Sequence, residues 1–159
     1  MTIKGLGVDI VEIDRMAAAL ERHPRMKERV FSADERRYCE KRNRPEVHYA
    51  LRFAAKEAVL KALGTGFSGM KFTDVEVLRD ATGRPAPKLS GRAAEVADEL
   101  GVIEMHLSLS YTHTTAVASA VAITGRAEPG APDPAKLRAA AFKDAKALLD
   151  DLEKPAEQD

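Results

Sequence analysis

Residues 47–63 predict one long helix, and this segment constrains the fold more than any other. The segment is rich in alanine, leucine, lysine and glutamate, contains neither glycine nor proline, and is followed directly by Gly64. These residue types favour helices, and glycine commonly occupies the position after the last helical turn. Any fold for this chain must therefore include one long, uninterrupted helix.

Shorter elements are predicted before this helix. Residues 3–13 are rich in β-branched residues, with two glycines, and predict a buried strand. Asp14 is placed to cap a helix that follows the strand. Ser32 and Glu35 form a capping-box pattern, which predicts the start of another helix.

The pattern after the long helix mixes strands with one short helix. Strands are predicted over residues 72–79, 106–110 and 116–123, with a hairpin turn over 81–85 and a helix capped by Ser90. Helices and strands do not alternate strictly, as they would in a parallel βαβ fold. The predicted fold class is therefore α+β.

The 159 residues are enough for one compact domain and too few for two comfortable ones. We predict that this domain spans residues 1–124. The composition of residues 125–133, with two glycines and two prolines, predicts a linker. Asp133 and Pro134 form a helix-start pattern, and apolar residues then fall on one face, so a helical extension is predicted over 134–154.

Composition and charge exclude several classes of protein. The 25 basic residues equal the 25 acidic ones, whereas a general nucleic-acid-binding protein usually carries a basic excess. Cys39 is the single cysteine, so neither an intramolecular disulfide nor a thiolate metal cluster can form. No apolar run approaches the roughly 18 to 20 residues that span a bilayer, and the first residues lack a signal peptide's apolar region. We therefore predict a cytoplasmic protein that binds neither membrane nor nucleic acid.

Two carboxylates are predicted to lie in apolar surroundings. Asp9 stands between Val8 and Ile10 in the first strand, and Glu57 projects onto the apolar face of the long helix. Burying an ionised carboxylate is costly unless a cation or hydrogen-bond donors compensate it. Two such residues from different elements supply the oxygen ligands that Mg²⁺ prefers, with water and phosphate oxygens completing its shell.

Lys61 lies one helical turn after Glu57, where the two side chains can meet. A carboxylate that holds a metal, with a lysine beside it, suits phosphoryl transfer, because both cations neutralise charge on the phosphate. The same spacing also fits an ordinary solvated Glu–Lys pair, and Asp9 alone also fits a turn aspartate. Spacing alone leaves both interpretations open.

Larger blocks of sequence identify a family. GLGVDIVEI over residues 5–13, RFAAKEA over 52–58 and HLSLS over 106–110 follow one another in that order, with a Gly-Arg-Pro turn over 83–85. In these blocks the chain resembles the holo-acyl-carrier-protein synthases, the small bacterial branch of the 4′-phosphopantetheinyl transferases. The resemblance covers about residues 3–124. It implies a long helix packed on a small antiparallel sheet, and a homotrimer with each active site built between two subunits.

The resemblance assigns roles to single residues. Asp9 and Glu57 match the family's magnesium ligands, and Lys61 matches its active-site lysine, so these three are the predicted catalytic residues. Further positions match those that line the coenzyme A site: Arg52, Gly64, Gly83, Arg84, Pro85, Ser110 and Thr112.

The implied reaction moves the phosphopantetheine arm of coenzyme A to a serine of an apo acyl carrier protein. The serine hydroxyl attacks the β-phosphate, and adenosine 3′,5′-bisphosphate leaves. The base for the serine proton is either Glu57 or a water on the metal. Carrier proteins are acidic, and basic residues outnumber acidic ones over residues 14–44, so Arg15 and Arg22 are the predicted carrier contacts.

The chain departs from the family pattern at Tyr111, where the family usually has histidine. The tyrosine hydroxyl replaces the histidine, or His113 takes over its role, or the turn tolerates the exchange. This departure motivates one alternative function, a catalytically impaired adaptor that binds a carrier protein or coenzyme A. A second alternative is a nucleic-acid-binding module, against which the neutral charge and the 5% aromatic content argue.

Overall fold

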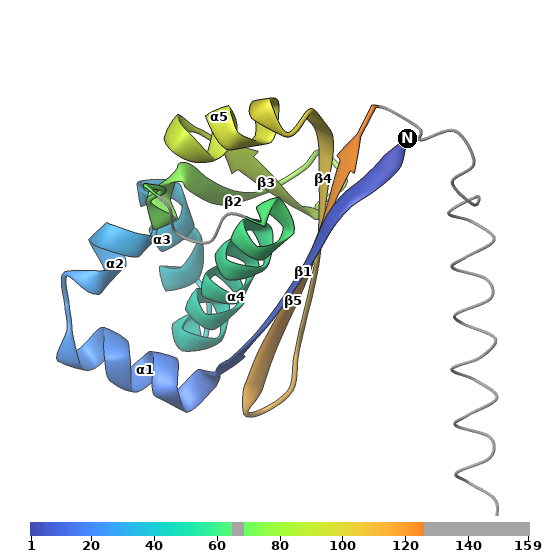
Figure 1. The fold of residues 1–159 in the computed structure, drawn as a ribbon. Coiled ribbons are helices and arrows are strands. Elements are labelled where there is room, and N and C mark those ends of the chain that lie inside the picture. Colours follow the sequence, from blue (N-terminus) through green and yellow to red (C-terminus); the bar gives the residue numbers. More distant parts are fainter. Residues whose placement is uncertain (65–68, 126–159) are drawn as a thin grey trace, which may run out of the picture. The chain divides into compact units, whose positions relative to one another are not determined.

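The computed structural model describes residues 1–64 and 69–125, and it confirms the predicted α+β class (Figure 1). In chain order the elements are β1 (Thr2–Glu12), α1 (Ile13–Arg22), α2 (Met26–Val30), α3 (Ala33–Glu40), α4 (Pro45–Leu63), the 3₁₀ turn η1 (Phe72–Asp74), β2 (Val75–Arg79), β3 (Pro85–Leu89), α5 (Gly91–Glu99), β4 (Val102–Tyr111) and β5 (Thr115–Thr124).

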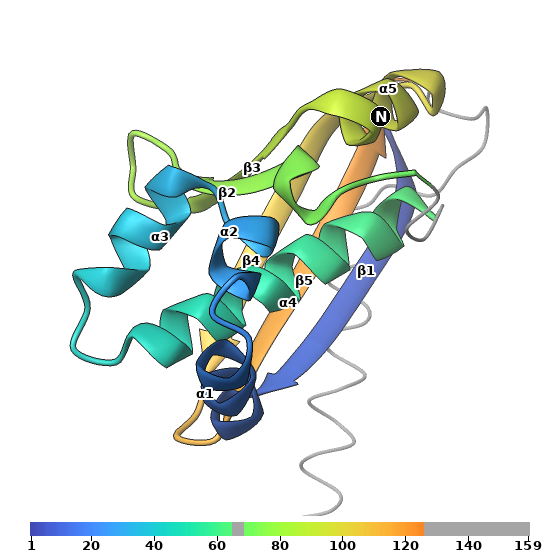
Figure 2. The ribbon, with the colours of Figure 1, turned by 90° about the vertical axis from the view of Figure 1, so that its left-hand side faces the viewer.

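The largest sheet is antiparallel, with the strand order β1-β5-β4, and α4 lies along one of its faces (Figures 1 and 2). The central strand presents small side chains to this helix. Every second residue of β5 is a fully buried alanine: Ala116, Ala118, Ala120 and Ala122. The facing side of α4 also carries buried alanines, so the helix and the sheet approach each other closely.

Glycines on β1 let the helix backbone approach this edge strand. A Cβ atom at Gly7 would lie 1.8 Å from the carbonyl oxygen of Ala58, and one at Gly5 would lie 1.9 Å from that of Ala62. Only glycine fits where two backbones come this close. The contact brings the inward side of β1, including Asp9, against the helix face that carries Glu57.

A buried ion pair connects α4 to the smaller β2–β3 sheet and to α3. Lys56 is completely buried, and its Nζ lies 2.9 Å from Oε2 of Glu35, which is 1% exposed. Lys56 also donates to the carbonyl oxygens of Phe72 and Val75, while Oε1 of Glu35 accepts from the Val77 amide at 2.9 Å. The charges are therefore satisfied by donors and acceptors from four elements, as burial requires.

The structure confirms the long helix and its predicted last residue. The helix begins two residues earlier than predicted, with Pro45 in the first turn, and ends at Leu63. Gly64 adopts a left-handed conformation with φ 73°, which explains why glycine follows the last turn. The capping box of Ser32 and Glu35 is also present.

Three local predictions are wrong. Residues 72–74 form a 3₁₀ turn, so the predicted strand begins only at Val75. Asp14 lies in the first turn of α1 instead of capping it, because β1 runs directly into the helix and Glu12 occupies the N-cap position. The first strand is buried on one side only, since Leu6 and Ile10 on its other side are each 64% exposed.

The predicted linker over 125–133, apart from Gly125, and the predicted extension over 134–154 lie outside the described residues. Within residues 1–64 and 69–125, no helix is long and apolar enough to cross a membrane.

Candidate active site

Asp9, Glu57 and Lys61 meet where β1 passes α4. The ammonium group of Lys61 lies 2.8 Å from Oδ1 of Asp9 and donates to the carbonyl oxygen of Val8 at 3.0 Å. The side chain of Asp9 is 16% exposed and that of Lys61 is 51% exposed. Lys61 therefore pairs with the carboxylate of the strand, and it acts on Glu57 through its charge.

Glu57 lies in surroundings that disfavour its charge. Burial raises the pKa of its carboxyl group, the negative charge of Asp9 raises it further, and Lys61 opposes both effects. Two carboxylates that repel each other gain stability when a cation binds near both. The sequence predicted this pair, and the structure brings its members together.

The chemistry of these groups fits a magnesium ion. Both side chains offer hard oxygen donors, and Mg²⁺ is typically held by one or two carboxylates while keeping several waters. Among the described residues there is no group of three or more histidine, cysteine, aspartate or glutamate side chains that would enclose a metal. Asp9 and Glu57 would thus leave positions open for water and for substrate phosphate oxygens.

The two carboxylates line a cavity of about 450 Å³. Arg15, Met16 and Phe53 line the same cavity, so its lining includes both apolar and charged side chains. Met16, which is 4% exposed, belongs to the core, whereas Arg15 is a predicted carrier contact.

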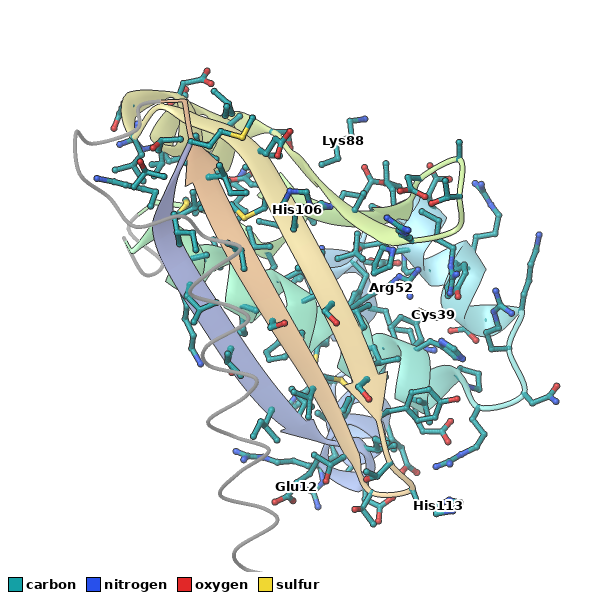
Figure 3. The ribbon with its side chains drawn as sticks, turned by 90° about the vertical axis from the view of Figure 1, so that its right-hand side faces the viewer. Glu12, Cys39, Arg52, Lys88, His106 and His113 are labelled. Atoms are coloured by element: carbon teal, nitrogen blue, oxygen red, sulfur yellow. The ribbon has the colours of Figure 1, made fainter. Side chains whose placement is uncertain are left out.

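A second cavity, of about 510 Å³, lies beside β4 on the other flank of α4. Three of the predicted coenzyme A residues line it, namely Arg52, Arg84 and Pro85, and so does Tyr111. Figure 3 shows Arg52 beyond the edge of β4, next to the helices that cover the other face of the sheet. Arg52 is only 5% exposed, although it is charged.

This second cavity also contains residues that the sequence analysis did not assign to the coenzyme A site. They are Tyr38, Arg42, His48 and Arg79. They come from α3, the segment after it, α4 and β2, so no single periodic pattern in the sequence joins them. Of the two arginines among them, only Arg42 falls within residues 14–44, where basic residues outnumber acidic ones.

The other predicted coenzyme A residues do not line these two cavities in the described part of the chain. Gly64 ends α4, and the carbonyl oxygen of Gly83 accepts a hydrogen bond from Arg79 at 2.7 Å. Ser110 is exposed near the end of β4. The hydroxyl oxygen of Thr112 accepts from backbone amides of the β4–β5 turn.

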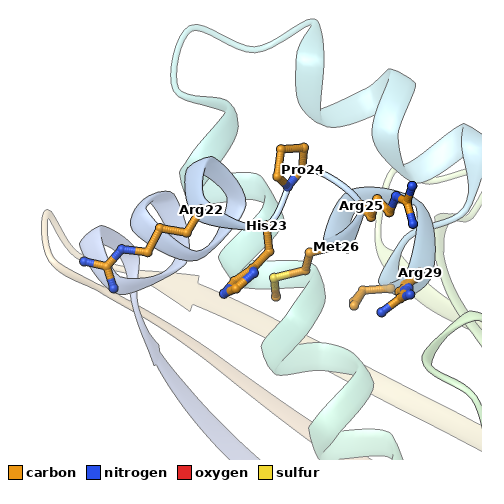
Figure 4. A pocket seen from close by; sticks show the side chains of 7 residues that line it. Arg22, His23, Pro24, Arg25, Met26 and Arg29 are labelled. Atoms are coloured by element: carbon orange, nitrogen blue, oxygen red, sulfur yellow. The ribbon is translucent and has the colours of Figure 1, made fainter.

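Arg22 lies in a third cavity, of about 640 Å³, between α1 and α2 (Figure 4). Arg25 and Arg29 also line it, so its charge is strongly positive. Met26 lines both this basic cavity and the carboxylate cavity, which places the two next to each other. The two predicted carrier contacts, Arg15 and Arg22, thus belong to adjoining cavities.

Comparisons with known proteins identify the family of this chain. Residues 5–119 match the family model described as the 4′-phosphopantetheinyl transferase superfamily. A holo-[acyl-carrier-protein] synthase of Alkaliphilus metalliredigens is 50% identical over 121 residues, which are 76% of this chain and 98% of the relative.

Solved structures with similar folds carry the same description. The holo-[acyl-carrier-protein] synthase of Neisseria meningitidis superposes with a TM-score of 0.70 at 31% identity, over 77% of this chain and 100% of the other. The Helicobacter pylori enzyme in complex with coenzyme A superposes with a TM-score of 0.66 at 28% identity, over 74% of this chain and 99% of the other.

Proposed function

The chain belongs to the 4′-phosphopantetheinyl transferase superfamily, and on this premise we propose how its residues carry out the transfer. It is a holo-[acyl-carrier-protein] synthase, an enzyme that transfers the 4′-phosphopantetheine arm of coenzyme A to apo acyl carrier protein. The observation that carries the proposed mechanism is that Asp9 and Glu57 line one cavity, while Lys61 pairs with Asp9.

Asp9 and Glu57 would hold Mg²⁺. Both carboxylates line one cavity, and the charge of Asp9 raises the pKa of Glu57, so a divalent cation would favour the ionised form of Glu57. When bound, the ion neutralises charge on the diphosphate of coenzyme A and orients it. Lys61, already 2.8 Å from Asp9, adds a second positive charge at the same place.

The remaining steps belong to side chains of the protein. The serine hydroxyl of the carrier attacks the β-phosphate of coenzyme A, and adenosine 3′,5′-bisphosphate leaves. We assign the serine proton to a carboxylate oxygen of Glu57, which lines the same cavity as Asp9. Lys61 stabilises the charge that develops on the phosphate, and positioning supplies most of the remaining rate enhancement.

The distribution of the predicted site supports a homotrimer with active sites between subunits. Arg52 and Glu57 are five residues apart on α4, so they point about 140° apart around the helix axis. Ala118 of β5 pairs with Asp9 on one side and with Leu109 on the other, so the carboxylates at the β1 edge and the second cavity, beside β4, lie at one level. A head-to-tail ring would join the β1 edge of one copy to the β4 edge of the next.

The outer face of the sheet also favours such a ring. Large apolar side chains that α4 does not cover are exposed on β1: Leu6 at 64%, Val8 at 48% and Ile10 at 64%. Contiguous exposed apolar side chains commonly mark an interface. A second copy packed over this face would remove them from water and bring Ser110 and Thr112 near a neighbouring cavity.

An acidic carrier protein is the proposed partner of the adjoining basic and carboxylate cavities. Arg15 lies beside Asp9 and Glu57, and Arg22 lies in the basic cavity that continues past Met26. Positive charge here would steer the carrier and leave its serine close to Glu57. The cytoplasmic location, and the absence of membrane and nucleic-acid partners, remain part of the proposal.

Intact-mass spectrometry of an apo acyl carrier protein, incubated with the enzyme, coenzyme A and Mg²⁺, tests this mechanism. We expect a mass gain of one phosphopantetheine that disappears with EDTA and in the Glu57→Gln variant. Glu95→Gln, the same change at an exposed site on α5, is the matched control and should transfer normally. No gain with any of several carriers would favour the adaptor alternative, and Tyr111→His would then be the first variant to test for restored transfer.

A further inference from the structure

Tyr38 lies at the centre of a cluster of three guanidinium groups. The Cζ atoms of Arg52, Arg42 and Arg79 lie 3.9, 4.4 and 5.2 Å from the centroid of its ring. Arg79 also donates to the Tyr38 hydroxyl, from Nη2 at 2.6 Å and from Nε at 3.1 Å. The negative face of an aromatic ring attracts cations at such distances, and the ring thereby holds three like charges together.

The positive charge of this cluster is not balanced by carboxylates. Within residues 1–64 and 69–125, none of the three guanidinium groups forms an ion pair. Arg52 is 5% exposed, and its Nε is buried without a hydrogen-bond partner in the same described residues. A buried, unpaired donor in a cavity of about 510 Å³ is a position where a ligand would complete the bonding.

A neighbouring histidine reports the same positive potential. The rings of His48 and Tyr38 meet edge to face, with their centroids 5.7 Å apart. Burial lowers the pKa of His48, and the charges of Arg42, Arg52 and Arg79 lower it further. The three guanidinium groups therefore disfavour a further positive charge on His48, as they would favour an anion from outside the chain.

We propose that Tyr38 is a positioning residue that holds Arg42, Arg52 and Arg79 ready for the ribose 3′-phosphate of coenzyme A. The inference rests on the proposed function. Coenzyme A carries a diphosphate and one separate phosphate on its ribose. The diphosphate reacts and has to reach the carboxylates, so the second anion needs a cationic site of its own.

Tyr38 also connects this cluster to the turn that carries Arg84 and Pro85. Arg79, which donates to the tyrosine hydroxyl, donates through Nη1 to the carbonyl oxygen of Gly83 at 2.7 Å. Tyr38 therefore holds the guanidinium group of Arg52 on α4 and, through Arg79, the β2–β3 turn. An aliphatic residue of similar size would fill the space but would neither attract the cations nor accept from Arg79.

Isothermal titration calorimetry with adenosine 3′,5′-bisphosphate and with adenosine 5′-monophosphate tests the inference without any transfer reaction. The wild-type protein should bind the bisphosphate more tightly. Tyr38→Leu and Tyr38→Met, which remove the ring, should weaken bisphosphate binding about tenfold and leave monophosphate binding almost unchanged. Tyr38→Phe keeps the ring and should retain most of the preference.

Steady-state transfer kinetics with coenzyme A and 3′-dephospho-coenzyme A supply a second readout. In Tyr38→Leu we expect the KM for coenzyme A to rise about tenfold, with kcat and the KM for the dephospho compound nearly unchanged. Arg37→Gln, a change on the adjacent residue, whose guanidinium group pairs with Asp34 on the surface, is the matched control and should behave as wild type. Urea unfolding of each variant identifies any general loss of structure.

The possible failures are distinguishable. Equal binding of the two nucleotides by the wild type, an equal effect of Phe and Leu at position 38, or a loss of kcat with both substrates would each overturn the role of Tyr38. A wild-type protein that prefers the bisphosphate, loses this preference in Tyr38→Leu and transfers nothing to any carrier would overturn the proposed function and support the positioning role.

Discussion

At the scale of single residues, charge burial separates the carboxylates of the candidate site from the charged side chains that hold the fold together. Asp9 and Glu57 are partly buried without full compensation, and they face a cavity. Glu35 and Lys56 are more deeply buried, but each is paired and hydrogen-bonded to backbone. Incomplete compensation therefore marks the candidate site better than burial itself does.

Lys56→Met should destabilise the fold strongly, because it leaves Glu35 charged and buried without its partner. Removing one member of a buried ion pair costs about 3–5 kcal/mol, whereas replacing both members by apolar residues can be nearly neutral. Urea denaturation of Lys56→Met, Glu35→Leu and the double variant measures this. A double variant no more stable than the singles would contradict the account.

The neutral state of His48 makes stability depend on pH. Burial and the three neighbouring guanidinium groups lower its pKa below the ordinary 6.5, so the unfolded chain binds a proton there before the folded chain does. Stability from this residue is present above the ordinary value and is lost as the pH falls through it. In urea unfolding between about pH 7 and about pH 5, His48→Gln should lose less stability than wild type. Parallel curves would show that the residue does not titrate in this way.

At the scale of elements, the β1–α4 contact sets the geometry of the carboxylates. Gly7→Ala places a Cβ where the carbonyl oxygen of Ala58 now lies, and backbone cannot move aside as a flexible side chain would. We expect a loss of about 1–3 kcal/mol or more in stability. Transfer activity should fall as well, because Asp9, two residues along the strand, is displaced from Glu57.

Differential scanning calorimetry and transfer assays measure both effects. The control is Gly101→Asn, at a site where a Cβ meets nothing within 4 Å and where asparagine tolerates the left-handed φ of 68°. The control should stay close to wild type in both measurements. An unchanged Gly7→Ala variant would show that the strand and helix are less tightly constrained than their distances imply.

The sequence predicts elements well where one local pattern decides them, and poorly where contacts between elements do. The long helix follows from its composition and from the glycine after it. Asp9 and Glu57 stand out as carboxylates in apolar surroundings, and the family resemblance decides between the interpretations of this pair. The burial of Glu35 and its pairing with Lys56 were not predicted, because a capping-box pattern ordinarily belongs to an exposed helix start. The three guanidinium groups around Tyr38 come together only in the folded chain, so local patterns do not reveal them.

At the scale of the whole molecule, the two faces of the main sheet differ. One face is covered by α4 and lined by fully buried alanines, which leave no room for larger side chains. The opposite face carries exposed Leu6, Val8 and Ile10, although nothing in the local strand geometry requires apolar residues there. The second face therefore has the properties of an interface, and the proposed ring accounts for it.

Leu6→Glu tests the ring directly. A charge on the outer face should disfavour burial against a second copy, while the fold of the single chain should survive because Leu6 is 64% exposed. Native mass spectrometry and light scattering should show a trimer for wild type and smaller species for the variant. Lys88→Glu, at the exposed position of β3, controls for a changed surface charge.

The same pair of variants tests whether the active site lies between subunits. If the carboxylates of one copy work with the second cavity, beside β4, of another copy, dissociation of Leu6→Glu should abolish transfer even though Asp9, Glu57 and Lys61 are intact. Activity should return at high protein concentration, where the ring re-forms by mass action. A monomeric Leu6→Glu variant with full activity would instead show that each chain holds a complete site. Bound coenzyme A would then have to extend from one flank of α4 to the other.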